Sequence, residues 1–96
     1  MFSGSVEKAL LEFFSSTTVS AAIADALAET QRPMTSGQIL TAVREIRHME
    51  EIPLKAIESS LTILSEAEII TNTKNGYELT DLGKELVEKL KSYRGE

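Results

Sequence analysis

The chain of 96 residues contains no cysteine and no tryptophan, and it has only two prolines. Without cysteine there is no disulfide framework, no thiolate zinc site and no thiol nucleophile, which fits a reducing compartment. The longest uncharged run, residues 13–24, is rich in Ser and Thr and is too short to span a bilayer. The N-terminus lacks a basic region followed by an apolar one, so we see no secretory signal. We therefore expect a cytoplasmic protein without membrane association.

Positive charge is also scarce, because ten Lys and Arg face fifteen Asp and Glu and leave a net charge of −5. Ten of the fifteen acidic side chains lie in residues 49–96. Neutralisation of phosphates supplies much of the affinity of DNA-binding proteins, so strong non-specific DNA binding is not expected. A local basic stripe would still permit specific binding. The ordinary hydrophobic (42%) and charged (26%) content predicts one small globular domain.

Groups for catalysis or metal binding are missing from the sequence. His48 is the only histidine, and no carboxylates stand near it in a ligand pattern. Glu50 and Glu51 are adjacent in a predicted loop, so they are not placed as an acid–base pair. Gly37 and Gly83 belong to no phosphate-binding loop. We expect no enzyme activity, no metal and no cofactor.

Apolar residues at helical spacing predict helices over residues 6–14 and 19–29, behind Thr35, from Pro53, and behind Thr80. Thr35 and Gln38 fit a capping box, in which each side chain accepts from the other residue's backbone N–H. Pro53 suits the first turn of a helix. The last three helices each have an apolar stripe. In the helix behind Thr35 it consists of Ile39, Leu40, Val43 and Ile46, and in the helix from Pro53 of Leu54, Ile57, Leu61 and Leu64. In the helix behind Thr80 it consists of Leu82, Leu86, Val87 and Leu90.

Between the last two helices the apolar period changes from 3.6 to 2, which predicts a β-hairpin. Ile69 and Ile70 start the first strand, and Tyr77 and Leu79 alternate with Glu78 in the second. Asn75-Gly76 tolerates the positive φ angles of a type I′ turn and is the strongest turn signal in the chain.

Three groups of residues carry a resemblance to a known superfamily: Thr35-x-x-Gln38-Ile39, Leu61-x-x-Leu64 with Ile69-Ile70, and Tyr77-x-Leu79-Thr80-x-x-Gly83-x-Glu85-Leu86. Residues 19–90 resemble the winged helix-turn-helix superfamily of small prokaryotic and archaeal transcriptional regulators, including the PadR, MarR and archaeal winged-helix types. The resemblance implies a mostly α fold with a small β-hairpin wing. The domain would comprise an N-terminal helical extension (1–17), the helix-turn-helix and wing (18–80) and a C-terminal helix (81–96). Such proteins often have Gly where this chain has Glu68, so we expect that turn to be built differently.

The resemblance also implies that the helix beginning near Pro53 reads double-stranded DNA. The candidate DNA-binding residues are Ser36, Arg44, Arg47, Lys55, Ser59, Thr62, Lys74 and Asn75. Glu58 and Glu66 on the same predicted face would be repelled by phosphate, although Glu accepts a hydrogen bond from the cytosine amino group. A solvated structural face remains the alternative for this helix. Arg44 and Arg47 fall on the exposed side of their predicted helix, opposite its apolar stripe. Their alternative role is pairing with nearby Glu side chains.

A homodimer is the expected assembly, because aromatic anchors are typical of interfaces. The candidate interface residues are Phe2, Leu10, Phe13, Phe14, Leu86 and Leu90. Packing of the first helix onto its own domain is the alternative. The sequence thus predicts a small dimeric DNA-binding transcriptional regulator without an effector domain. The alternative is a winged-helix module that binds a basic protein partner and no DNA.

Overall fold

The computed structural model describes residues 18–46 and 49–93. The elements follow in the order α2 (Thr18–Thr30), α3 (Ser36–Ile46), α4 (Leu54–Glu66), β1 (Ile70–Thr73), β2 (Gly76–Leu79) and α5 (Asp81–Tyr93). The strands pair antiparallel in a two-stranded sheet, which we call the wing. The prediction of a mostly helical fold with a small β-hairpin wing is confirmed. The helix expected over residues 6–14 lies outside the described residues.

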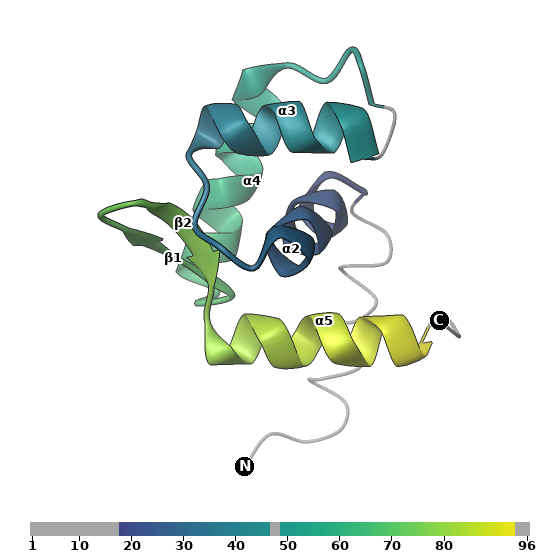
Figure 1. Ribbon diagram of the computed structural model, residues 1–96, viewed down its shortest axis with the longest axis vertical. Coiled ribbons are helices and arrows are strands. Elements are labelled where there is room, and N and C mark those ends of the chain that lie inside the picture. Colours follow the sequence, from purple (N-terminus) through teal and green to yellow (C-terminus); the bar gives the residue numbers. More distant parts are fainter. Residues whose placement is uncertain (1–17, 47–48, 94–96) are drawn as a thin grey trace.

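Helix α2 is the centre of the domain. It contacts α3, α4, α5 and β2, and Figure 1 shows it between α3 and α5, with α4 behind and the wing projecting to one side. Its residues Ser20 to Ala24 are all buried, with Ile23 fully enclosed. Alanine makes this possible, because a thin helix lets neighbours approach its axis from several sides.

The starts of α3 and α4 follow local sequence signals. The Thr35 N–H donates to Gln38 Oε1 (3.0 Å), and the Gln38 N–H donates to Thr35 Oγ1 (3.2 Å), so the predicted capping box is confirmed. Pro53 is the N-cap of α4, and its carbonyl accepts from the N–H of Ala56 at 3.1 Å. Its missing N–H costs nothing there, because the first N–H groups of a helix have no intrahelical acceptor.

Two leucines of the predicted stripes lie outside the core. Leu54 is 40% exposed at the first position of α4, and Leu82 is 39% exposed in the first turn of α5. The remaining members of the α4 and α5 stripes are buried, as predicted. The spacing alone did not reveal that Leu54 and Leu82 are left partly exposed in the first turns of these helices.

Helix α4 ends in a Schellman motif, with hydrogen bonds from the Ile69 N–H to the Leu64 carbonyl and from the Glu68 N–H to the Ser65 carbonyl, both 3.0 Å. Glu68 has the left-handed conformation, with φ of 61°. The expectation of a differently built turn is therefore wrong: the turn has the geometry that favours Gly, and Glu68 adopts it. Buried Leu64 and Ile69 supply the apolar contact that usually accompanies this motif.

Glu68→Gly is expected to raise the free energy of unfolding by about 0.5–1 kcal/mol, because the left-handed conformation is costly for a residue with a Cβ atom. The backbone carbonyl of Glu68, which accepts from Thr80 Oγ1 at 2.6 Å, is retained in the variant. Urea denaturation measures the change. The matched control is Glu66→Gly within α4, which removes the same charge and should destabilise by about the same amount. Equal destabilisation by both variants would contradict the strain at Glu68.

The turn of the wing differs by one residue from the prediction. Thr73 pairs with Gly76, so Lys74 and Asn75 are the two turn residues. Asn75 does not have a positive φ angle, whereas Gly76, which follows the turn, has a φ of 125°. The assignment of Asn75-Gly76 to a type I′ turn is therefore wrong. Thr73 Oγ1 stabilises the observed turn by accepting from the Asn75 N–H (3.1 Å) and donating to the Gly76 carbonyl (2.7 Å).

The wing is also fixed close to its turn, because Tyr77 of β2 pairs with the loop between α2 and α3. The Met34 N–H donates to the Tyr77 carbonyl (2.9 Å), and the Tyr77 N–H donates to the Met34 carbonyl (2.7 Å). A Cβ atom on Gly76 would lie 2.6 Å from the Met34 carbonyl oxygen. Gly76 is thus required by its conformation and by the close approach of Met34.

Candidate functional site

The side chains expected to read DNA lie on one exposed side of α4. Lys55, Ser59, Thr62 and Glu66 follow each other at spacings of four, three and four residues, which is one stripe along a helix, and all are exposed. The opposite side of α4 is buried through Ile57, Ser60, Leu61 and Leu64. Within the described part of the chain, this stripe therefore lies on the surface, although Thr62 Oγ1 also donates to the Glu58 carbonyl at 3.1 Å.

The two margins of this stripe differ in chemistry. Glu58 is exposed on one side, towards Leu54. On the other side Ile63 is 49% exposed, the largest fraction among the large apolar side chains of the described residues. The stripe contains Lys55 and Glu66, and Glu58 lies beside it, so this surface is slightly acidic. The surface is therefore suited to hydrogen bonding and limited apolar contact rather than to strong attraction of phosphate.

The tip of the wing presents two of the predicted residues. Lys74 and Asn75 are both exposed, and their backbone is held by the Thr73 hydroxyl. Ser36, at the first position of α3, is half-buried. Asn75 lines a shallow groove with the first turns of α3, so the structure brings the wing tip and the start of α3 to the same groove.

Arg44 has a structural contact that the sequence did not reveal. Its guanidinium Nη2 donates to the Ile52 carbonyl at 2.9 Å, and its Nε is buried. The prediction that Arg44 lies on the exposed side of its helix is therefore wrong. The side chain is half-buried and ties the loop before α4 to α3. Arg47 and His48 lie outside the described residues.

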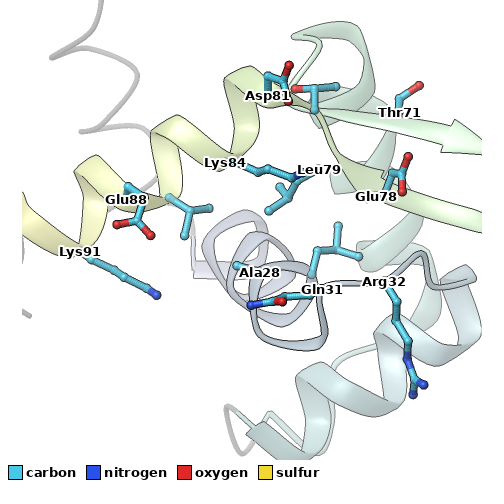
Figure 2. A pocket seen from close by; sticks show the side chains of 13 residues that line it. Ala28, Gln31, Arg32, Thr71, Glu78, Leu79, Asp81, Lys84, Glu88 and Lys91 are labelled. Atoms are coloured by element: carbon cyan, nitrogen blue, oxygen red, sulfur yellow. The ribbon is translucent and has the colours of Figure 1, made fainter.

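Two grooves flank the loop that joins α2 to α3, and Arg32 lines both. The first lies between the end of α2, β2 and α5, and its charged side chains have both signs (Figure 2): Arg32, Glu78, Asp81, Lys84, Glu88 and Lys91. The second is the groove of α3 and Asn75. Arg32 is not among the candidates predicted from the sequence, because those cations lie on α4, on or after α3, and on the wing. A basic residue directly before Pro33 was the available signal.

The candidate interface residues divide into two sets. Phe2, Leu10, Phe13 and Phe14 lie outside the described residues. Leu86 and Leu90 are 4% and 1% exposed and belong to the hydrophobic core, on the α5 side that packs towards α2. Their assignment to a dimer interface is corrected, because side chains enclosed by their own domain are not available to a second copy.

In residues 18–46 and 49–93, no three His, Asp or Glu side chains are grouped as ligands for a metal ion. Over the same ranges, no helix has the length and apolar character needed to cross a membrane. No protein-family model, curated protein or solved structure matches the chain significantly.

Proposed function

We propose that the chain is a small DNA-binding transcriptional regulator that acts as a homodimer, inserts α4 into the major groove and contacts the flanking backbone with the wing. The observation that carries this proposal is the exposed stripe of α4 beside an anchored wing. A helix that is buried on one side and exposed along the other has the shape that helix-turn-helix proteins insert into DNA.

The roles of the side chains follow from their chemistry. Lys55 and Ser59, in the first turns of α4, donate hydrogen bonds to base edges or to phosphates. Thr62, further along the helix, does so when its hydroxyl rotates away from the Glu58 carbonyl. Lys74 and Asn75 contact the backbone beside the groove, and Ser36 contacts it at the start of α3. Glu58 accepts from an exposed cytosine amino group, which makes it a specificity element rather than an affinity element.

The proposal predicts weak, salt-dependent binding. With Lys55 and Lys74 each neutralising one phosphate per protomer, a dimer loses affinity on the order of a hundredfold between about 50 and 200 mM salt. Fluorescence anisotropy with a pool of mixed-sequence duplexes measures this dependence. The free protein should sediment at twice the chain mass of 10.5 kDa. An absence of binding at low salt would contradict the proposal, as would affinity that does not change with salt.

A second candidate function is a protein-binding module, which is favoured by the 49% exposure of Ile63 on a slightly acidic helix surface. Its partner would be a basic segment with an apolar side chain that covers Ile63. Pull-down experiments with the wild-type chain and with Ile63→Asp as bait test it. A partner retained equally by both baits would contradict the role of Ile63.

A further inference from the structure

Only one of the side chains that line the groove between α3 and the wing is positively charged. The lining side chains come from the loop between α2 and α3, from α3 and from the wing, and they include Arg32, Met34, Thr35, Gln38, Glu45 and Asn75. Arg32 is the basic member of this set, and Glu45 is the acidic member. Arg32 is exposed, so its charge is accessible from the groove.

The Arg32 side chain lines this groove and extends away from the charged side chains of the other one. Figure 2 shows the guanidinium pointing away from Lys84 and Glu78, which line the other groove. Within residues 18–46 and 49–93, Arg32 makes no ion pair. A planar guanidinium in this position presents paired N–H donors, which match the geometry of a phosphate group.

The backbone on both sides of Arg32 is fixed. Gln31 ends α2 in the left-handed conformation (φ 55°), and its N–H donates to the Leu27 carbonyl at 3.0 Å. Pro33 restricts the next φ angle, and Met34 is held by its two hydrogen bonds to Tyr77 in the wing. Arg32 is thus attached to the same rigid unit as the wing, two residues from the bridge.

The start of α3 does not replace this charge. The capping box uses the N–H groups of Thr35 and Gln38, so the start of α3 offers the uncharged N–H groups of Ser36 and Gly37 and no full positive charge. The positive charge available in the groove is therefore mainly that of the Arg32 guanidinium. Asn75, at the edge of the groove, adds an uncharged amide donor.

We infer that Arg32 contacts a phosphate of the DNA backbone in the groove between α3 and the wing. This inference depends on the proposed DNA binding. It assigns a third cation to each protomer, beside Lys55 and Lys74, and it places a backbone contact on the α3 side of the wing. Arg32 would position the duplex and would not read its bases.

The test compares Arg32→Ala with Lys84→Ala in the duplex anisotropy assay at several salt concentrations. Both substitutions remove one exposed positive charge. Lys84, however, lines only the groove between α2, β2 and α5, whereas Arg32 also lines the groove between α3 and the wing. Arg32→Ala is expected to weaken binding about three- to tenfold at low salt and to reduce the magnitude of the salt slope by about one per protomer. Lys84→Ala should change neither value appreciably. Arg32→Lys should restore most of the salt slope, because it returns the charge.

The outcomes separate the inference from the function on which it depends. If the wild-type chain binds duplex DNA and Arg32→Ala behaves like Lys84→Ala, the role of Arg32 is excluded and the proposed function stands. If the wild-type chain does not bind duplex DNA, both are overturned. Equal thermal midpoints of the three variants exclude an effect through unfolding.

Discussion

Gly83→Ala is expected to lower the free energy of unfolding by about 2 kcal/mol, because the added methyl group meets the backbone of Ile69. An ideal Cβ atom on Gly83 would overlap the Ile69 carbonyl oxygen and lie 3.1 Å from its carbonyl carbon. The same carbonyl accepts from the Thr80 N–H (3.0 Å) and from Thr80 Oγ1 (3.1 Å), so it has little freedom to move away. Overpacking of about 3 kcal/mol is offset by about 1 kcal/mol of helix propensity.

The matched control is Gly37→Ala, because it makes the same substitution in another helix. A Cβ atom at Gly37 meets nothing within 4 Å, so this variant should be stabilised by about 0.5 kcal/mol through helix propensity. Differential scanning calorimetry should give thermal midpoints that move in opposite directions, with Gly83→Ala lower by about 10 °C. A Gly83→Ala protein as stable as the wild type would contradict the close packing of α5 against the start of the wing.

Much of the fold could be predicted, because its signals are local. The capping box of Thr35 and Gln38, the apolar spacing of α4 and the alternation around the wing each involve neighbouring residues. The details that the sequence did not provide depend on contacts between distant segments. Gly76 follows the turn residues because Met34 approaches it, and Gly83 is needed because Ile69 lies against α5.

The candidate site was predictable only in part. Helical periodicity was enough to place Lys55, Ser59 and Thr62 on one exposed side of α4. It could not reveal that Arg44 reaches the Ile52 carbonyl, because this contact depends on the path of the loop between α3 and α4. Nor could it reveal that Arg32 lines the same groove as Asn75, because the bridge between Met34 and Tyr77 joins segments more than forty residues apart.

The double substitution Lys55→Glu with Lys74→Glu is expected to weaken duplex DNA binding about thirtyfold or more at low salt. Each substitution removes a phosphate contact and places a repelling carboxylate at the same position. Both side chains are exposed, so the folded state and its thermal midpoint should be retained. Sedimentation before the binding assay establishes that the variant keeps the mass of the wild type.

The measurement that tests the central claim most directly compares this variant with Lys84→Glu plus Lys91→Glu. The second pair changes the net charge by the same amount, but its side chains line the groove between α2 and α5. If α4 and the wing bind DNA, anisotropy should show the large loss for the first variant and less than about a threefold loss for the second. Equal losses would show that only net charge matters and would contradict a DNA-binding surface formed by α4 and the wing.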